Sequence, residues 1–517
     1  MLINIHCAKC VGIDAVPVTV EVNISSGLGI HLVGLADAAV KESLLRTITA
    51  LQSMGFRIPG KKIVINLAPA DMHKKGSGYD IPIALGIIAA SAQRDLPLLE
   101  RFLVMGELGL DGAVREIPGA LPIVELADQL GLQGCILPKA SACEAAEYGG
   151  LDVYGVETLD DVLQILCGEE DCTGMLVRNL AMHIDASSST PVQDGSVMDL
   201  SEIIGQEAAK RGLEIAAAGG HNAILIGSPG SGKSSLAKAM AGILPPMSLE
   251  ESLQTSKIYS VAGKGNPLGG LMRKRPFRAP HYSASMAALL GGGTDNILPG
   301  EISLAHNGIL FADEFCETPK KIMEALRGPM EDRKVTISRL KAKVEFPADF
   351  MLIAATNPCP CGYHGDGERC TCTPAKRLAY ISKLSGPIMD RIDIQLFVSR
   401  VDARRLVNRK KAESSAEVAA RVLHAREVQK DRFKDEGIFC NASMSNRQIE
   451  KYCPLSADCQ VLLERIIEHM GLSARACSRI IKLARTIADL ADAPDILPAH
   501  LSEAASYRFL DKQNIFE

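Results

Sequence analysis

The chain has 517 residues, of which 47% are hydrophobic and 23% are charged, and its formal net charge at pH 7 is −5. This length predicts about two to four domains, and the composition is that of a soluble globular protein. Because the net charge is negative, the surface as a whole does not attract nucleic acid, so any such contact has to be local.

The apolar segments and the N-terminus predict a cytoplasmic protein. The longest apolar stretch, residues 81–92, is too short to span a bilayer and contains Pro82. The first residues lack the basic, apolar and cleavage regions of a signal peptide. We therefore expect the 15 cysteines to be reduced thiols or metal ligands, and not a disulfide framework.

The chain divides into three blocks and a linker. Residues 1–175 alternate strand-like and helix-like segments, which predicts an α+β or α/β domain. Residues 176–198 are small, polar and rich in turn formers, as is typical of a linker. Residues 199–400 carry the nucleotide motifs, and residues 401–517 have apolar residues at helical spacing. In the first block the predicted strands are residues 16–24, 62–67 and 101–105, and the predicted helices are residues 37–54 and 83–92.

Residues 227–234 fit the phosphate-binding loop pattern G-x-x-x-x-G-K-[ST] at every fixed position. An apolar run precedes them and a helix-like run follows, which is the context that the motif requires. The glycines let backbone N–H groups close around phosphate oxygens. Lys233 is then placed to reach the β- and γ-phosphates of ATP, and the Ser234 hydroxyl to ligate Mg²⁺. The predicted nucleotide-binding residues are Gly227, Ser228, Pro229, Gly230, Ser231, Gly232, Lys233, Ser234 and Ser235.

Two later apolar segments end in polar residues suited to hydrolysis. The first ends in Asp313 and Glu314, where Asp313 would hold Mg²⁺ and Glu314 would polarise the attacking water. The second ends in Asn357, which is placed to orient water near the γ-phosphate. Taken alone, such residues are commonly a surface acidic pair and a turn residue. Their position after a phosphate-binding loop favours the catalytic interpretation.

Basic residues gather in two places. Residues 335–344 alternate and predict a β-hairpin with Arg339 and Lys341 near its tip. In a ring with a central channel these two would grip DNA phosphates without reading bases. A charged hairpin by itself is more often a solvated edge that blocks aggregation. The other place is residues 273–278, with four basic residues in six, in a long segment between the phosphate-binding loop and Asp313.

Four cysteines form a compact C-x-C-x₈-C-x-C pattern, and thiolates paired across a short Gly-rich loop suit a tetrahedral zinc site. His364 could replace one ligand, and the alternative is four unligated thiols on an exposed loop. Cys7 and Cys10 have no second pair nearby and are interpreted as core residues. The predicted zinc ligands are Cys359, Cys361, Cys370 and Cys372.

Together with three further segments, these motifs resemble the magnesium-chelatase-like AAA+ ATPases of the YifB/ComM type. That family is related to the chelatase ATPase subunit and to the MCM replicative helicases. The resemblance covers essentially the whole chain. It implies an AAA+ P-loop core with a parallel sheet, an insertion at helix 2, a C-terminal helical lid, and a hairpin that points into a ring pore. The further segments are residues 277–285, 299–308 and 356–362.

The resemblance also assigns arginines. Arg391 lies in the arginine-finger segment and would reach the γ-phosphate held by a neighbouring subunit, where a guanidinium stabilises transition-state charge. The alternative is a helix-end arginine that pairs with Asp390 or Asp393. Arg475 matches the sensor-2 arginine of the lid helix. Arg479, one turn further on, faces nearly the same direction and is its rival.

Residues 60–140 resemble the Lon-protease fold, a ribosomal-protein-S5-like α/β domain. The match fails at the catalytic positions, because Gly78 stands at the nucleophile position, with Ser77 one place early, and Leu121 stands at the lysine position. A Ser–Lys dyad needs a hydroxyl and a nearby amine in register. We therefore expect no peptidase activity. The matching segments are residues 66–76, 105–112 and 136–139.

These observations lead to two functional hypotheses. The first is an ATP-hydrolysing homo-oligomeric ring, expected to be a hexamer, that moves single-stranded or branched DNA. The resemblance implies helicase or branch-migration activity in recombination or natural transformation. The second is a chelatase-type remodelling ATPase subunit that acts on a protein partner. ATP and Mg²⁺ are the expected cofactors in both cases, with zinc as a structural metal.

Overall fold

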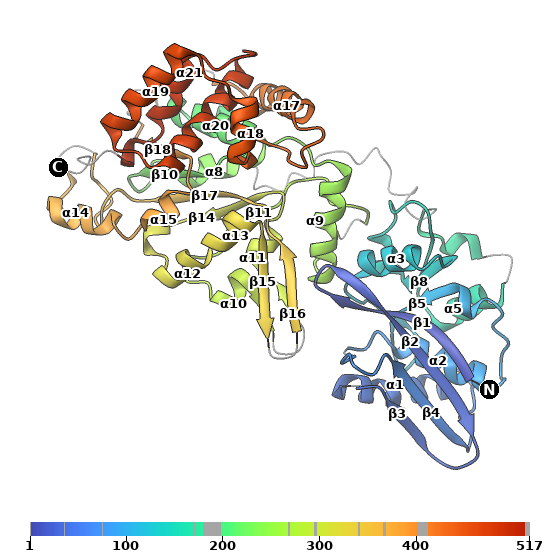
Figure 1. The fold of residues 1–517 in the computed structure, drawn as a ribbon. Coiled ribbons are helices and arrows are strands. Elements are labelled where there is room, and N and C mark those ends of the chain that lie inside the picture. Colours follow the sequence, from blue (N-terminus) through green and yellow to red (C-terminus); the bar gives the residue numbers. More distant parts are fainter. Residues whose placement is uncertain are drawn as a thin grey trace.

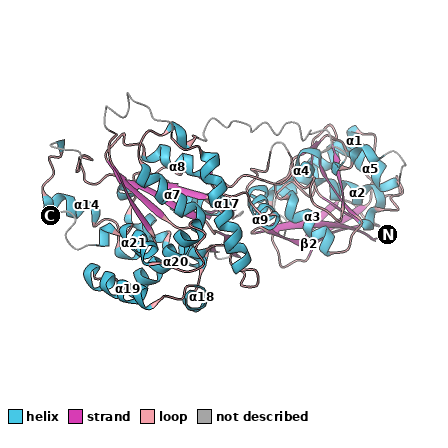
Figure 2. Ribbon diagram, turned by 90° about the horizontal axis from the view of Figure 1, so that it is seen from above, coloured by secondary structure: helices cyan, strands magenta, loops and turns pink. Residues whose placement is uncertain are grey.

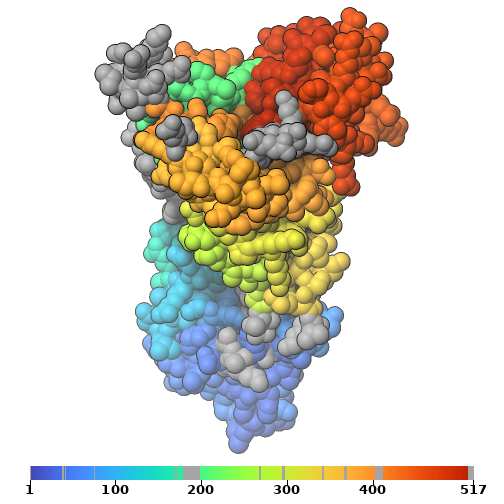
Figure 3. All heavy atoms as spheres, turned by 90° about the vertical axis from the view of Figure 1, so that its left-hand side faces the viewer, coloured from blue at the N-terminus to red at the C-terminus, as the bar shows by residue number. Residues whose placement is uncertain are grey.

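The structure is a computed structural model in which two lobes meet at a long helix (Figure 1). The N-terminal lobe occupies one end of the molecule, and the C-terminal helices occupy the other (Figure 3). Most of the expected linker and Lys341 lie outside the described residues. Within the described part of the chain, no helix has the length and apolar character needed to cross a membrane. The described residues are 2–35, 37–74, 76–168, 172–178, 198–266, 269–293, 297–339, 342–365, 369–401 and 412–511.

The N-terminal lobe is built on a seven-stranded mixed sheet of order β3-β4-β2-β1-β5-β8-β9. Its α/β character confirms the prediction for this block. The strands are β1 (Leu2–Val11), β2 (Asp14–Ser25), β3 (Ile30–Val33), β4 (Lys62–Ala68), β5 (Phe102–Val104), β8 (Gly134–Pro138) and β9 (Asp152–Val156), with β6 (Glu107–Leu108) and β7 (Val114–Arg115) as a separate pair. The helices are α1 (Ala38–Ser53), α2 (Asp80–Ala90), α3 (Ala120–Gln129), α4 (Lys139–Cys143) and α5 (Leu159–Cys167).

The second lobe is built on a five-stranded parallel sheet of order β11-β14-β17-β10-β18. Its strands are β10 (Ala223–Gly227), β11 (Phe277–Arg278), β14 (Ile309–Ala312), β17 (Met351–Thr356) and β18 (Ile394–Val398). Its helices are α7 (Glu207–Gly219), α8 (Lys233–Ala241), α9 (Leu249–Val261), α10 (Met286–Leu290), α11 (Glu301–Leu304), α12 (Lys320–Ala325), α13 (Arg327–Asp332), α14 (Pro374–Ile381) and α15 (Gly386–Met389). Two hairpins complete it, β12 (Gly291–Gly292) with β13 (Leu298–Pro299), and β15 (Lys334–Arg339) with β16 (Ala342–Pro347).

The central strands of the parallel sheet, β10, β14 and β17, are almost entirely apolar because both faces of the sheet are covered. Along β10, Ala223 and Leu225 point into one core, and Ile224 and Ile226 point into the other. The first core is shared with the C-terminal helices, and the second lies under α12 and the hairpin β15–β16. The C-terminal helices are α17 (Ser415–Arg432), α18 (Asn446–Tyr452), α19 (Ala457–Met470), α20 (Ala474–Leu490) and α21 (Pro498–Ser506).

The starts of the C-terminal helices follow capping signals in the sequence. Ser414 and Glu417 form a capping box at α17, and the Ser473 side chain accepts a hydrogen bond from the first turn of α20. Such caps satisfy backbone N–H groups that the helix itself leaves unpaired. Helix α20 is therefore fixed at the turn that carries Arg475 and Arg479.

The N-terminal lobe docks on α9, which lies beside α3 in both ribbon views (Figures 1 and 2). Lys257 of α9 forms ion pairs with Glu125 at 2.5 Å and with Asp14 at 3.2 Å. The Ser260 carbonyl accepts a hydrogen bond of 3.0 Å from the Gly119 N–H. At Gly12, the turn between β1 and β2 lies against β16: a Cβ there would be 3.1 Å from the Glu345 carbonyl oxygen. The lobe therefore contacts both α9 and the hairpin β15–β16.

Candidate active site

The phosphate-binding loop leaves the carboxyl end of β10 and enters α8. Gly230 and Gly232 have φ values of 74° and 95°, a region that side chains other than glycine rarely adopt. At Gly227 a Cβ would lie 2.2 Å from the Val398 carbonyl oxygen, so only glycine fits there. The Ser231 hydroxyl is buried and has no hydrogen-bond partner among the described residues. An unpartnered polar atom inside a glycine cradle suits a phosphate ligand.

Lys233 lies inside this loop. Its ammonium group donates hydrogen bonds to the carbonyl oxygens of Gly227 at 2.7 Å and Ser228 at 3.1 Å. It also donates to Asn357 Oδ1 at 3.3 Å. Burial lowers the pKa of Lys233, while the charges of Asp313 and Glu314 oppose that shift. A desolvated ammonium held by weak neutral acceptors is suited to exchange them for phosphate oxygens.

The magnesium side of the site is formed by Ser234 and Asp313. The Ser234 hydroxyl donates a hydrogen bond of 3.0 Å to Asp313 Oδ2, and Asp313 Oδ1 accepts the N–H of Glu314 at 2.9 Å. Glu314 has a φ of 50°, so the chain turns sharply immediately after Asp313. Oxygen ligands of this type are those that Mg²⁺ prefers. The described residues therefore fit the Mg²⁺–ATP that the motif predicts.

The register of the sheet explains why these residues meet. In β17, which lies between β10 and β14, Thr356 is opposite Ile226 and Ala354 is opposite Ala312. Asn357 therefore leaves the sheet at the level of the phosphate-binding loop and beside the Asp-Glu turn. Carboxyl ends of neighbouring parallel strands are the usual ligand site of such sheets.

The predicted arginines lie at the opposite edge of the same sheet, which is formed by the amino ends of the strands. Arg391 precedes β18, and its carbonyl accepts a hydrogen bond of 3.0 Å from the side chain of Asn222, which precedes β10. The amino end of a five-residue strand is about 15 Å from its carboxyl end. Arg391 is thus separated from the phosphate-binding loop of its own chain by the length of β10.

Three arginines gather around one carboxylate at this edge. Arg391 forms a hydrogen-bonded ion pair with Glu331 of α13, and that bond, followed by the charges of Arg391, Arg475 and Arg479, holds the pKa of Glu331 below its usual range. The alternative of Arg391 pairing with Asp390 or Asp393 is not what the structure shows. It is Arg479 that pairs with Asp393. Arg475 is exposed on the same helix.

Asp393 fixes the position of Arg479. It is buried, and its other oxygen lies 3.0 Å from His221 Nδ1. Burial alone would raise its pKa, but the Arg479 guanidinium and the hydrogen bond to His221 hold the pKa of Asp393 well below the ordinary value. The sequence analysis treated Asp393 only as an alternative partner for Arg391.

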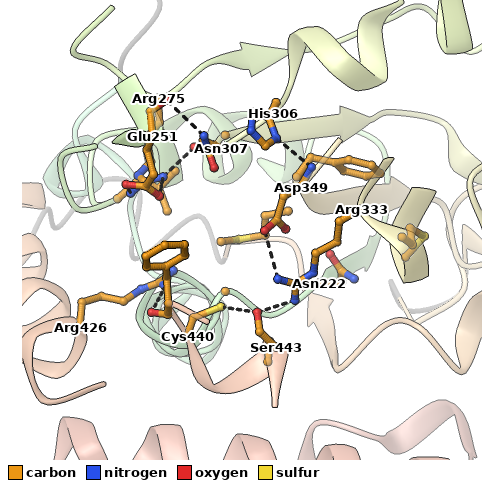
Figure 4. A pocket seen from close by; sticks show the side chains of 18 of the residues that line it. Asn222, Glu251, Arg275, His306, Asn307, Arg333, Asp349, Arg426, Cys440 and Ser443 are labelled. Atoms are coloured by element: carbon orange, nitrogen blue, oxygen red, sulfur yellow. Dashed lines mark hydrogen bonds and ion pairs between the residues drawn. The ribbon is translucent and has the colours of Figure 1, made fainter. Parts of the chain in front are cut away.

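A polar pocket of about 200 Å³ opens at this edge of the sheet (Figure 4). Residues from α9, from the base of the hairpin β15–β16 and from the C-terminal helices converge there. Arg333 links two of these parts, because it pairs with Asp349 at 3.1 Å and also donates to Ser443, which lies between α17 and α18. The pocket residues labelled in Figure 4 are Asn222, Glu251, Arg275, His306, Asn307, Arg333, Asp349, Arg426, Cys440 and Ser443.

His306 is a buried member of the pocket that the sequence analysis did not assign. Its Nδ1 accepts the Asp349 N–H at 3.0 Å, so its Nε2 carries the hydrogen that is directed at Gln254 Oε1, 2.9 Å away. Burial lowers the pKa of His306 to about 4. The ring is therefore neutral at pH 7 and ties α9 to the start of β14 and β17. The only sequence signal was its place in residues 299–308.

Most of the basic run 273–278 is engaged inside the molecule. Arg275 makes a bidentate pair with Glu251 at 2.9 Å, and Arg278 makes one with Glu301 at 2.6 and 2.7 Å. Arg273 pairs with Glu147 of the N-terminal lobe. Arg275 therefore binds this segment to α9 and Arg278 binds it to α11, while Arg273 remains largely exposed beside the N-terminal lobe.

The hairpin β15–β16 projects from the second lobe (Figure 1). Val335, Ile337, Val344 and Phe346 face the core. Arg339 follows Val335 and Ile337 on the same face of β15, but it lies at the end of the strand, beyond the core, and is exposed. A Cβ on Gly292 would lie 3.5 Å from Arg339 Nη2, which places the small hairpin β12–β13 beside it. The exposed residues at this end include Lys343.

The four predicted cysteines converge on one point. Their sulfur atoms all lie within 4.8 Å of one another, with Cys359–Cys361 at 3.3 Å, Cys359–Cys370 at 3.8 Å and Cys361–Cys370 at 3.7 Å. Sulfurs on a zinc ion at about 2.3 Å are separated by about 3.8 Å in a tetrahedron. The cluster could therefore hold a structural metal ion. His364 lies with its Nδ1 2.7 Å from Arg377 and is not part of the cluster.

In the N-terminal lobe, the positions that would carry the catalytic serine and lysine of a Lon-type protease hold other residues. The Ser77 hydroxyl donates to Glu107, and Gly78 packs near Met105, where a Cβ would lie 2.9 Å from its methyl group. Leu121 is buried in the first turn of α3, and its N–H faces Ser260 of α9 at 3.4 Å. In the described structure α9 thus contacts the turn that would carry a catalytic lysine.

A phosphate-binding loop on β10, an Asp-Glu pair on β14 and an asparagine on the intervening β17 define a P-loop ATPase of the AAA+ class. Comparison with known proteins specifies the family. Three family models match: "Magnesium chelatase, subunit ChlI" over residues 199–406, "Subunit ChlI of Mg-chelatase" over 20–141 and "Magnesium chelatase, subunit ChlI C-terminal" over 412–508.

Full-length relatives agree with these models. The chain is 44% identical to the uncharacterized protein YifB of Salmonella typhimurium, covering 98% of this chain and 97% of the relative. It is 41% identical to the competence protein ComM of Haemophilus influenzae with the same coverage. It is also 29% identical to an archaeal Lon protease of Methanocaldococcus jannaschii over 29% of this chain and 23% of that protein. The chain belongs to the YifB/ComM family of magnesium-chelatase-like AAA+ ATPases, so it is an ATPase that uses ATP and Mg²⁺.

Proposed function

We propose that the protein is a ring-forming motor, expected to be a hexamer, that uses ATP hydrolysis to move single-stranded or branched DNA. The observation that carries the proposal is the division of the catalytic groups between two edges of one sheet. The phosphate-binding loop, Asp313 and Glu314 lie at the carboxyl edge, and Arg391 and Arg479 lie at the amino edge. A site divided in this way is completed only by a second copy of the chain.

At the carboxyl edge each side chain has a defined task. Lys233 leaves its loop carbonyls for phosphate oxygens, and Ser234 and Asp313 hold the magnesium ion. Glu314 accepts the proton of the attacking water, and Asn357 orients that water from the adjacent strand. Bound Mg²⁺–ATP supplies the γ-phosphoryl group on which this water acts.

At the amino edge the arginines serve the neighbouring subunit. Arg391 and Arg479 are held by Glu331 and Asp393, so in the isolated chain each guanidinium has a carboxylate that stands in for phosphate. In a ring they would turn toward the γ-phosphate of the next subunit and stabilise its transition state. Arg475, exposed one turn before Arg479 on α20, is the predicted lid arginine, and Arg479 is its rival. Hydrolysis is in this way coupled to assembly.

The DNA contact is assigned to the hairpin β15–β16. Arg339, exposed at the end of β15, would hold the phosphate backbone together with the predicted contact Lys341, without reading sequence. The hairpin leads through Asp349 into β17, and Asn357 follows the end of β17, so the position of the hairpin is connected to the hydrolytic site. The ComM relative is a competence protein, which suits a role with incoming DNA in natural transformation.

A structural zinc ion completes the proposal. The sulfur separations at Cys359, Cys361 and Cys370 are those of a tetrahedral thiolate site, and Cys372 lies within the same cluster. This pattern of four thiolates is a set that zinc prefers.

The experiment is an ATPase assay of the wild type and of Glu314→Gln, alone, with single-stranded DNA and with forked DNA, together with strand displacement on the fork. We expect DNA to stimulate hydrolysis in the wild type, and Arg339→Ala to reduce that stimulation about tenfold without changing the basal rate. Lys320→Ala is the matched control, because Lys320 is an exposed lysine of α12 that is paired with Glu324.

If DNA neither stimulates hydrolysis nor is unwound, the motor proposal is wrong. A rate that responds to a protein partner and not to DNA would instead support the alternative, a chelatase-type remodelling ATPase. If Arg339→Ala and Lys320→Ala change the stimulation by DNA equally, the hairpin does not contact the DNA.

A further inference from the structure

The loop that carries the four cysteines rests on the phosphate-binding loop. Gly362 has a φ of 85°, and a Cβ at this position would lie 2.8 Å from both Cδ and Cγ of Pro229. The same Cβ would lie 3.7 Å from Cγ of Asn357. The backbone at Gly362 therefore touches the ATP site at two of its predicted residues.

The cysteines are placed to hold this contact in position. Cys359 is fully buried two residues after Asn357, and Cys361 immediately precedes Gly362. The Gly362 N–H donates to the Cys359 carbonyl at 2.9 Å, which closes a tight turn between the two thiols. Cys370 and Cys372 come from the far end of the loop. One ion bound by all four sulfurs would fix both ends of the loop at once.

A fixed cysteine loop affects nucleotide binding because the phosphate-binding loop loses much conformational entropy when it becomes ordered. Gly230 and Gly232 both have positive φ, and glycine loses more conformational freedom on ordering than any other residue. Pro229 is the residue of this loop that meets Gly362. A rigid neighbour at Pro229 would lower the entropy that nucleotide binding has to overcome.

We propose that the zinc site is a clamp for ATP binding: the bound ion holds the turn at Gly362 against Pro229 and so pre-organises the phosphate-binding loop. The inference rests on the zinc assigned under the proposed function, but it does not depend on DNA. It gives the cysteine cluster a role in nucleotide affinity that is separate from its role in folding.

The first test is metal content, measured by mass spectrometry on the purified full-length chain. We expect about one zinc ion per chain in the wild type and a loss of nearly all of it in Cys361→Ser/Cys370→Ser. Cys370→His should retain the ion, because imidazole is also a zinc ligand. Cys167→Ser is the matched control, because Cys167 is a partly exposed thiol of the N-terminal lobe that lies outside the cluster.

The second test perturbs the contact between Gly362 and Pro229 while leaving the zinc ligands in place. Gly362→Ala adds a methyl group against Pro229, and Gly365→Ala adds one against Phe397, where a Cβ would lie 2.9 Å from Cζ. Both glycines have a φ of 85°, so the backbone strain is matched. We expect both variants to bind zinc, and only Gly362→Ala to weaken the binding of a fluorescent ATP analogue by about tenfold or more.

Each outcome tests one part of the proposal, either the metal site or the clamp. A wild-type chain without zinc overturns the metal site and the clamp together. Zinc-bearing chains in which Gly362→Ala and Gly365→Ala bind nucleotide equally overturn the clamp alone. If the double cysteine variant fails to fold, the nucleotide affinities of Gly362→Ala and Gly365→Ala still test the clamp. Because nucleotide affinity is measured without DNA, failure of the motor proposal would leave this result unchanged.

Discussion

The Lys233 ammonium lies 3.3 Å from Asn357 Oδ1, which connects the phosphate-binding loop of β10 to the end of β17. The two residues are far apart in the sequence and adjacent in the sheet. This contact places the residue that binds phosphate next to the residue predicted to orient water. The site is therefore assembled by strand order, and its behaviour in variants can be predicted from that geometry.

Glu314→Gln should separate binding from hydrolysis. The glutamine keeps the shape of the side chain but is no longer a base, so we expect the hydrolysis rate to fall about a hundredfold or more. Affinity for ATP should stay within about twofold, because no hydrogen bond joins the Glu314 side chain to Lys233 or to Ser234 in the described structure. Single-turnover hydrolysis and equilibrium binding measure the two quantities. Parallel loss of binding would show that Glu314 has a different task.

Arg391→Ala and Arg479→Ala should retain ATP binding and lose hydrolysis, because both side chains lie at the edge opposite the phosphate-binding loop. Loss of an arginine finger lowers the rate of ATP hydrolysis about a thousandfold. Mixing Lys233→Ala with Arg391→Ala should restore activity, since each subunit supplies the half that the other lacks.

The control for this mixing experiment is Arg391→Ala combined with the double variant Lys233→Ala/Arg391→Ala. That mixture contains no intact finger and should stay inactive. A mixture of the two single variants that is as inactive as its components would contradict a shared site.

Lys257→Met should loosen the N-terminal lobe. The side chain of Lys257 is 10% exposed, and its replacement leaves Glu125, 25% exposed, without its partner. After allowance for screening, we expect a loss of about 1–3 kcal/mol in denaturant unfolding of this lobe. Lys139→Met is the control, because its pair with Glu157 is largely exposed and should contribute about 0.5 kcal/mol or less. Equal effects would contradict the assigned docking.

His306 should make stability depend on pH. Its folded pKa of about 4 is below the ordinary value of 6.5, so between these values the unfolded chain binds a proton that the native chain does not. Stability is complete above about pH 6.5 and falls as the pH drops toward 4, by about 2 kcal/mol at pH 5.

The matched variant for this prediction is His306→Asn, which keeps an acceptor for the Asp349 N–H and does not titrate. The comparison is the change in unfolding midpoint between pH 7 and pH 5 in the two proteins. An equal change in both would show that other groups account for the acid sensitivity.

The local parts of this protein could be predicted from neighbouring residues. The glycines and Lys233 specify a phosphate-binding loop because that function resides in consecutive backbone groups. Alternating apolar residues predicted β2, β4 and the hairpin β15–β16, and helical spacing predicted α1 and α2, all within a few residues of the observed bounds. The four cysteines were predicted to meet because a short loop joins them.

Contacts between distant residues could not be predicted in this way, because they depend on how the whole chain packs. The basic run at 273–278 contains no local signal for its partners, and folding places Glu147, Glu251 and Glu301 against its three arginines. His306, Arg333 and Asp393 carried no local pattern, because their partners are brought by other elements. Whether Arg391 shares an edge with Lys233 depends on strand direction and order, which are set by the packing of the whole sheet and not by neighbours in the chain.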